Sequence, residues 1–285
     1  MVSLKLIKEV LKEARYFPRH AYKVGTSRAK NGVFPHEKFT FGKAEKQYLC
    51  WFEPKKVTQD KIIIFYHGGG WTFGTPELFS DRAKLFMDQG YIVVMPAHRK
   101  LPKFWYPHIK EDLGLALKKV RSIMQQKDIL DKKILVGGMS SGGNLAALML
   151  LDQSIWADTG FKSNDFVGGF FCGAPLDLNA MTDSFVLASF AGKRNSETFQ
   201  LASPISHLPE SINKPILIVH GTRDGLVNYQ CALDFVEKLR KVNKKPIDFY
   251  TIPKGSHLKA VSWAYEDNEV RQHILTWLST LGLQY

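Results

Sequence analysis

Short apolar segments alternate with longer amphipathic segments along most of the chain. Residues 61–66 read Lys-Ile-Ile-Ile-Phe-Tyr, an apolar and β-branched run that is typical of a strand buried on both faces. Similar strand patterns occur at residues 91–95, 134–136, 166–171, 215–219 and 247–252. Helical patterns separate them, at residues 75–89, 107–126, 144–151, 229–241 and 268–282. This alternation predicts βαβ units and an α/β fold with a mostly parallel central sheet flanked by helices.

Three segments depart from this alternation. Residues 38–53 hold two short alternating segments, which predict a leading hairpin. Residues 176–206 show no strand pattern, and we expect an insertion there that covers a ligand crevice. The N-terminus has apolar residues at helical spacing, which predict an amphipathic helix. These apolar residues are Leu4, Ile7, Leu11 and Ala14.

Length and composition narrow the class of protein. The chain has 285 residues, of which 45% are hydrophobic and 23% are charged, and these values exclude disordered, collagen-like and coiled-coil chains. No apolar run approaches the about 20 residues that a membrane-spanning helix needs, so we expect no transmembrane segment. The three cysteines are scattered, which argues against a disulfide framework, and charged residues interrupt the apolar positions that a signal peptide requires. We therefore expect a cytoplasmic protein.

Positive charge is concentrated at the N-terminus. The net charge is +12, and residues 1–30 hold eight Lys or Arg against two Glu. Such a stretch attracts nucleic acid, anionic membranes or acidic ligands, or is simply a solvated helix face. The sequence has no zinc-finger spacing and no aromatic RNA-binding string, so we expect no nucleic-acid partner.

The segment Gly138-Met-Ser-Ser-Gly142 fits the pattern G-x-S-x-G. In α/β enzymes this pattern places a nucleophilic serine on a sharp turn between a strand and a helix. A predicted strand precedes the segment and a predicted helix follows it, so Ser140 is expected at the top of the sheet, beside the positive end of that helix. The alternative is a glycine-rich turn in which the serine only caps the helix.

A second glycine-rich segment, His67-Gly-Gly-Gly-Trp71, directly follows the strand predicted at residues 61–66. Consecutive glycines let backbone N–H groups approach a ligand closely. We expect the N–H groups of Gly69, Gly70 and Ser141 to form an oxyanion hole, with His67 bracing the loop. A phosphate-binding loop is the competing use of such glycines, but no Gly-Lys-Ser/Thr follows.

A serine nucleophile needs a general base, and the base needs an acid that orients it. In this type of fold the acid follows the serine along the chain, and the histidine follows the acid. Asp224 comes just after a predicted strand, and only two histidines follow it, His257 and His273. His273 falls inside the last predicted helix, whereas His257 is expected on a loop. We therefore predict Ser140, Asp224 and His257 as catalytic residues, against the alternatives of a turn-forming aspartate and a surface histidine.

Together these motifs make the chain resemble an α/β-hydrolase of the hormone-sensitive-lipase-like esterase group. The resemblance runs from about residue 45 to the end, and it also rests on Phe73-Gly74, Ser203-Pro-Ile205 and His220-Gly-Thr-Arg-Asp224. It implies an α/β-hydrolase fold with a catalytic domain over residues 46–285. It further implies a helical cap built from the N-terminal region, residues 1–45, and from the insertion at about 176–206.

The resemblance implies a serine carboxylesterase that cleaves small acyl esters through an acyl-enzyme on Ser140, with no metal and no organic cofactor. An amide hydrolase, such as an arylformamidase or a small peptidase, uses the same residues and is the main alternative. A ligand-binding protein on a disabled hydrolase scaffold is a third, although such proteins usually lose the serine or the histidine. The expected partner is a small-molecule ester, and a homodimer is left open.

Aromatic residues close to these motifs are candidates for lining the substrate pocket, and each of them also suits the core. The candidates are Trp71, Phe73, Trp105, Phe185 and Phe190. We also expect the N-terminal helix to pack Leu4, Ile7 and Leu11 onto the cap and narrow the acyl pocket. In the alternative interpretation, the apolar face of this N-terminal helix binds to an anionic membrane.

Overall fold

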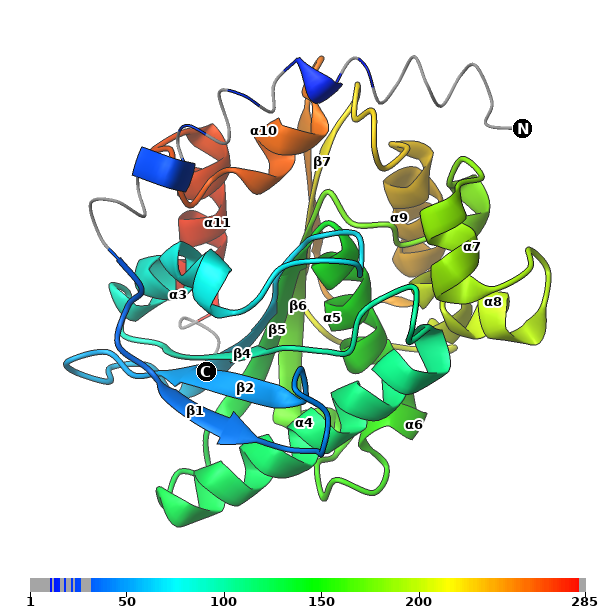
Figure 1. Ribbon diagram of the computed structural model, residues 1–285. Coiled ribbons are helices and arrows are strands. Elements are labelled where there is room, and N and C mark those ends of the chain that lie inside the picture. The colour runs from blue at the N-terminus through cyan, green and yellow to red at the C-terminus, as the bar shows by residue number, and fades with distance from the viewer. Residues whose placement is uncertain are drawn as a thin grey trace.

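A computed structural model of the chain describes residues 11, 13–15, 18, 22, 24–26 and 32–281 (Figure 1). Within these residues, eight strands form one sheet in the order β1-β2-β4-β3-β5-β6-β7-β8. The strands are β1 (Glu37–Thr40), β2 (Tyr48–Phe52), β3 (Lys61–Tyr66), β4 (Ile92–Pro96), β5 (Lys133–Met139), β6 (Phe166–Cys172), β7 (Ile216–Gly221) and β8 (Ile247–Ile252). β2 pairs antiparallel with β1 and β4, and the remaining pairs are parallel. The predicted hairpin and the mostly parallel sheet are confirmed.

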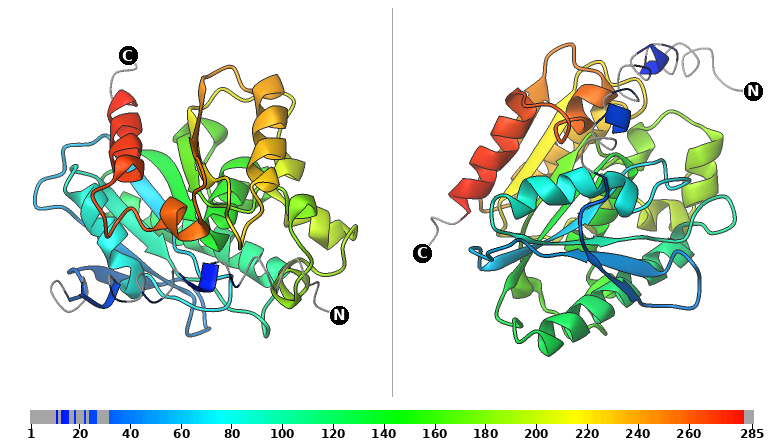
Figure 2. Two further views of the ribbon diagram at one scale, coloured as in Figure 1. Left: turned by 90° about the horizontal axis from the view of Figure 1, so that it is seen from above. Right: turned by 60° about the vertical axis from the view of Figure 1, so that its left-hand side comes forward.

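Helices cover both faces of the sheet (Figure 2). The α-helices are α3 (Ser80–Met87), α4 (Tyr106–Gln126), α5 (Ser141–Leu151), α6 (Gln153–Trp156), α7 (Phe185–Ala191), α8 (Glu197–Leu201), α9 (Gln230–Val242), α10 (His257–Val261) and α11 (Glu269–Thr280). Helices α4, α5 and α9 contribute to one apolar core, and α3, α10 and α11 contribute to a second. The sheet is therefore the middle of three layers, as the alternation of strand and helix predicts.

The strand β3 shows why the sheet is buried on both sides. Side chains of successive strand residues point to opposite faces. Ile62, Ile64 and Tyr66 belong to one core, while Ile63 and Phe65 belong to the other. All five side chains are buried, so an unbroken apolar run, rather than an alternating one, is what this position in the sheet requires.

Some predicted elements differ in detail. The helix expected from residue 75 begins as a 3₁₀ turn, η1 (Glu77–Phe79), with the Thr75 hydroxyl accepting the N–H of Leu78 at 3.3 Å. The segment 176–206 contains no strand, but it does contain η3 (Leu178–Ala180), α7, α8 and part of η4 (Pro204–His207). The expectation that His257 lies on a loop is corrected, because His257 is the first residue of α10.

No helix in the described ranges combines the length and the apolar character needed to cross a bilayer. Of the N-terminal apolar positions, Leu4 and Ile7 lie outside the described residues. Leu11 is 63% exposed, so the prediction that its side chain packs onto the cap is wrong. An apolar residue at helical spacing on a short segment does not by itself decide which surface, if any, covers it.

A buried ion pair holds the segment that follows β4. The carboxylate of Asp112 on α4 accepts hydrogen bonds from the Arg99 backbone N–H at 2.7 Å, from Arg99 Nε at 2.9 Å and from Gln47 Nε2 at 2.8 Å. The same segment meets the glycine loop, because the Leu101 N–H donates to the carbonyl oxygen of Trp71 at 3.1 Å. Asp112 thus connects α4, through this segment, to the loop that carries Gly69 and Gly70.

We expect Asp112→Ala to lower the free energy of unfolding by about 3–5 kcal/mol, because the buried donors of Arg99 and Gln47 lose their acceptor. Glu111→Ala is the matched control. The Glu111 carboxylate also contacts Arg99, but its side chain is 60% exposed, so a loss below about 1 kcal/mol is expected. Urea denaturation measures both, and equal losses in the two variants would contradict this account.

Candidate active site

Ser140 lies on the turn between β5 and α5. Its backbone dihedral angles are φ 52° and ψ −131°, a region that residues with a side chain rarely adopt. Such strain is of order 1–3 kcal/mol and persists only where the surroundings enforce it. Here the Ser140 N–H donates to the carbonyl oxygen of Cys172 on β6 at 2.8 Å. The turn predicted from G-x-S-x-G is therefore present, and it sets Ser140 at the carboxyl end of β5.

Gly142 brings this turn into direct contact with the glycine loop. A Cβ atom at Gly142 would lie 2.2 Å from the carbonyl oxygen of Tyr66 and 2.3 Å from that of His67. Both neighbours are backbone atoms, so no side-chain movement relieves such a clash. On the other side of the turn, a Cβ at Gly68 would lie 3.1 Å from Ser140 Cβ. Ser140 and the glycine loop are thus packed together at backbone distance.

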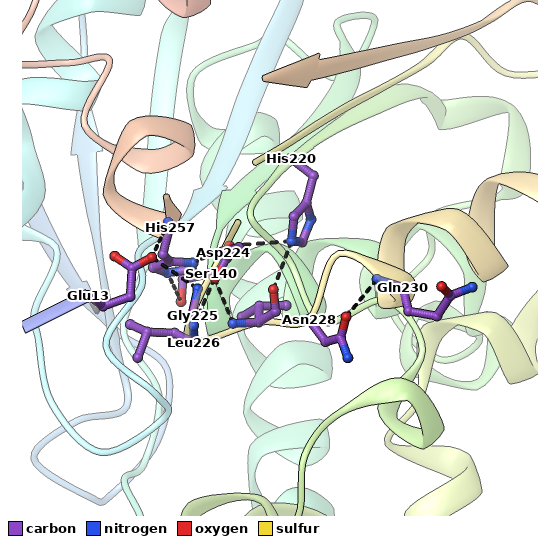
Figure 3. A network of polar contacts seen from close by, with 10 residues as sticks. Glu13, Ser140, His220, Asp224, Gly225, Leu226, Asn228, Gln230 and His257 are labelled. Carbon is purple, nitrogen blue, oxygen red and sulfur yellow. Dashed lines mark hydrogen bonds and ion pairs between the residues drawn. The ribbon is translucent and has the colours of Figure 1, made fainter. Parts of the chain in front are cut away.

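Ser140, His257 and Asp224 form a continuous chain of hydrogen bonds (Figure 3). His257 Nδ1 lies 2.7 Å from Asp224 Oδ2, and His257 Nε2 lies 3.0 Å from Ser140 Oγ. An ionised carboxylate can only accept, so Nδ1 carries the proton and Nε2 is left to accept from the serine hydroxyl. The structure therefore brings together the three residues predicted as catalytic, with the imidazole in the tautomer that accepts a proton.

Asp224 is held by donors on both of its oxygens. Oδ1 accepts the backbone N–H groups of Leu226 at 2.9 Å and Val227 at 2.8 Å. Oδ2 also lies 3.3 Å from Nε2 of His220, whose ring donates to the Val227 carbonyl oxygen at 3.0 Å. Burial alone would raise the pKa of Asp224, but the charge of His257 and the hydrogen bonds from His220 and His257 hold it below its usual value. Asp224 thus remains an anion in this buried position.

The pKa of His257 is raised above its ordinary value of 6.5. Burial alone would lower it, since burial disfavours the charged imidazolium. The charge of Asp224 and its hydrogen bond outweigh this effect, and the charge of Glu13 acts in the same direction. His257 is therefore a stronger base than a histidine in water.

Gly69 and Gly70 adopt positive φ angles of 131° and 59° in the loop after β3. Their backbone N–H groups donate no hydrogen bond to any other described residue. Ser141 is the first residue of α5, and an N–H at this position has no partner within its own helix. These are the three groups expected to bind an oxyanion, and their role stays a prediction. His67 contacts its own loop, donating from Nδ1 to the Gly68 carbonyl oxygen at 2.6 Å.

A cavity of about 820 Å³ opens onto Ser140 and His257. The glycine loop, α7 and the residues after Asp224 contribute to its wall, and so do Val24 and Gly25 from the N-terminal segment. Most of the lining side chains are apolar. The site therefore combines a polar hydrogen-bond chain at one wall with a largely apolar space beside it, as is typical of small-molecule sites.

The five aromatic pocket candidates divide into two groups. Trp71 and Phe73 line the cavity, whereas Trp105, Phe185 and Phe190 are not among its lining residues. Phe190 is fully buried and stacks on Trp71 with ring centroids 3.9 Å apart, so it supports the wall from behind. Phe185 is 78% exposed. Trp105 precedes α4 and is 39% exposed, so the expectation that these three line the pocket is corrected.

Three residues near the cavity were not singled out by any sequence motif as members of the site. They are Glu13, His220 and Arg82. Arg82 lines the cavity although it is fully buried, and it donates to the Tyr265 hydroxyl and, at 3.1 Å, to the Val261 carbonyl oxygen. His220 lies in the segment His220-Gly-Thr-Arg-Asp224, so its position four residues before Asp224 could have marked it as a neighbour of the site. Glu13 and Arg82 reach the site only through tertiary packing, so no local pattern marks them.

One group of side chains has the composition of a metal site. His36, Cys50 and Glu77 bring one ligand atom each within 4.8 Å of one another. However, the Glu77 carboxylate already accepts from Tyr48 at 2.8 Å and from Lys38 at 3.2 Å. Burial, with the nearby charge of Glu77, raises the pKa of Cys50 to about 12, which keeps the thiol protonated and a poor ligand.

A family model described as BD-FAE matches residues 50–239, which is more than half of the chain. The chain belongs to the BD-FAE family. This membership confirms the resemblance to hormone-sensitive-lipase-like α/β hydrolases. The matched residues include the glycine loop, Ser140 and Asp224, and they end before His257.

Curated relatives include enzymes of two kinds. The chain is 25% identical to esterase LipC of Mycobacterium tuberculosis over 212 residues, covering 69% of this chain and 52% of LipC. It is 27% identical to kynurenine formamidase of Danio rerio over 264 residues, covering 90% of this chain and 85% of that enzyme. The chain spans about half the length of the mycobacterial esterases LipC, LipM and LipQ.

Among solved structures, esterase B from Lactobacillus Rhamnosis superimposes with a TM-score of 0.73 at 18% identity, covering 99% of this chain and 96% of that one. At this level of identity the likeness concerns the fold. The expected α/β-hydrolase fold is therefore confirmed.

We expect Gly142→Ala to lower the free energy of unfolding by more than about 3 kcal/mol, because its Cβ meets two carbonyl oxygens of the neighbouring loop. Ser141→Ala is the matched control on the adjacent residue. The Ser141 hydroxyl is buried without a partner among the described residues, so its removal is expected to change stability by less than about 1 kcal/mol. Thermal and urea denaturation compare the two, and a Gly142→Ala protein as stable as the wild type would show that this contact is not tight.

Proposed function

We propose that the protein is a serine carboxylester hydrolase. The observation that carries the proposal is the hydrogen-bond chain from Ser140 through His257 to Asp224, at the wall of a largely apolar cavity. Membership of the BD-FAE family and the esterases among its relatives support the same class of activity.

In the first half of the reaction, Ser140 Oγ attacks the acyl carbon of the ester while His257 Nε2 takes its proton. Asp224 stabilises the imidazolium that forms and keeps the ring in place. The negative oxygen of the tetrahedral intermediate accepts hydrogen bonds from Gly69, Gly70 and Ser141. His257 then delivers the proton to the leaving alcohol, and the acyl group stays on Ser140.

In the second half, His257 removes a proton from water, and the water attacks the acyl carbon of the acyl-enzyme. The same three N–H groups bind the negative oxygen of the second tetrahedral intermediate. The acid leaves and Ser140 regains its proton. Every catalytic group in this scheme is a side chain or a backbone N–H of this chain. The apolar lining of the cavity favours an uncharged, apolar acyl group, because burying such a group there removes apolar surface from water.

Amide hydrolysis is a second candidate with support of its own. The kynurenine formamidase of Danio rerio aligns with 90% of this chain, a larger share than LipC does. The same three residues cleave an aryl formamide by the same steps, with the amine as leaving group. A panel of nitrophenyl esters of increasing acyl length, assayed beside a formanilide, separates the candidates by their relative kcat/KM values. If the protein cleaves neither the esters nor the formanilide, the result would favour a ligand-binding role.

We expect Ser140→Ala to reduce kcat on nitrophenyl esters by about 10⁴–10⁶-fold while the protein stays folded, because the attacking oxygen is removed. Circular dichroism checks the fold. Ser141→Ala is expected to keep most of the activity, since only its backbone N–H acts. A Ser140→Ala enzyme that retains a tenth of the wild-type rate would rule out Ser140 as the nucleophile.

The pH profile of kcat/KM is expected to have an acidic limb governed by His257. The ring accepts a proton only when neutral, and its pKa is raised above 6.5. Activity is therefore present at pH values above this raised pKa and is lost as the pH falls through it. Rates on a nitrophenyl ester between pH 5 and pH 9 measure the limb. A flat profile on the acidic side, or a limb well below the ordinary histidine value, would be inconsistent with His257 as the base.

A further inference from the structure

Glu13 places a carboxylate beside the predicted catalytic residues, from a segment far away in the sequence. Its backbone is helical and the residue is 1% exposed. Oε1 accepts the backbone N–H of His257 at 2.7 Å and that of Gly225 at 3.0 Å (Figure 3). Oε2 is also buried, and it has no hydrogen-bond partner among the described residues. Glu13 is therefore buried against the backbone of the site without lining the cavity.

The two N–H groups lie at the ends of two different connections, which follow β7 and β8. Gly225 directly follows Asp224 in the loop after β7, and His257 begins α10 directly after the loop that follows β8. A single oxygen that accepts from both fixes the separation of these loops. The Asp224–His257 hydrogen bond of 2.7 Å spans the same gap on the side-chain side. Glu13 thus connects the two segments through their backbone N–H groups, and Asp224 connects them through the side chain of His257.

Burying a carboxylate with one unpartnered oxygen is unfavourable for folding. Buried ionic groups of this kind are typical of functional sites, where a fixed charge acts on a reacting group. During turnover the reacting group is His257, which becomes a cation twice in each catalytic cycle. A second anion near it favours that cation, and a buried anion acts more strongly than an exposed one.

We propose that Glu13 is a positioning residue of the active site, which holds the loops of Asp224 and His257 in register and stabilises the imidazolium with its charge. The inference rests on the proposed function of Ser140, Asp224 and His257. It makes the N-terminal segment part of the catalytic machinery, although this segment precedes the residues matched by the family model.

The surroundings of His257 identify which charges bear on its titration. Asp224 faces the ring from the loop after β7, Glu13 faces its backbone from the N-terminal segment, and the uncharged Ser140 faces Nε2. The pKa of His257 responds to the charges of Asp224 and Glu13. Among the other described titratable side chains of these segments, His220 contacts Asp224, and the following are exposed: Arg15, Tyr22, Arg223, Lys254 and Lys259.

Glu13→Gln tests the charge, because it keeps the size and an acceptor oxygen. We expect the acidic limb of kcat/KM to move to lower pH, since without the anion His257 is protonated less readily. We expect kcat to fall while KM stays within about twofold, because Glu13 does not line the cavity. Glu210→Gln, the same change at an exposed position, is the matched control and is expected to leave both limb and kcat unchanged.

Glu13→Asp tests the position. The shorter side chain keeps the charge but not the reach to both N–H groups, so we expect kcat to fall by up to about 10²-fold with little shift of the limb. The proposal is overturned if neither variant differs from Glu210→Gln in kcat or in pH profile. It is also overturned if both variants are unfolded by circular dichroism, which would assign Glu13 to structure alone. The Ser140→Ala variant distinguishes the two proposals. If that variant stays active, the proposed function fails. If it is inactive and the Glu13 variants behave as wild type, only the role of Glu13 fails.

Discussion

The contact between Gly142 and the carbonyl oxygens of Tyr66 and His67 is the constraint on which the site depends. It joins the turn after β5 to the loop after β3, two neighbouring parallel strands of the sheet. The strained backbone of Ser140 and the positive φ angles of Gly69 and Gly70 are both held in this one packed unit. Ser140, the proposed nucleophile, and the expected oxyanion donors are therefore held in one packed unit, as electrostatic preorganisation of a catalytic site requires.

The proposed acid and base, Asp224 and His257, come from strands further along the same edge of the sheet. β7 and β8 are adjacent and parallel, so the loops at their carboxyl ends meet, and β6 is the only strand between them and β5. Four anionic or basic side chains are buried there: Asp224, His220, His257 and Glu13. Each makes hydrogen bonds to another of these groups or to the backbone, while Glu13 Oε2 has no partner among the described residues. The members of this network act on one another's charge.

The parts of this site that the sequence predicted are those with a local signature. Ser140, Asp224 and His257 each follow an apolar strand, and the chain order of the three limits the choice of partners. Phe185 and Phe190 are pocket candidates only because they are aromatic and near the motifs in the sequence. Packing decides which face of α7 meets the cavity, and Leu187 lines it instead. Glu13 lies on a basic segment that resembles a solvated helix face. Its burial depends on two loops more than 200 residues further along the chain.

In the proposed mechanism, Ser140 carries the acyl group during turnover. The most direct measurement is covalent trapping with an activated phosphonate ester, which reacts with a catalytic serine and is not released by water, followed by peptide mass spectrometry. We expect one adduct per chain, on the peptide that contains Ser140, formed at a rate that falls as His257 becomes protonated. An adduct on Ser141 or on another residue, or no adduct in a folded and active protein, would contradict it.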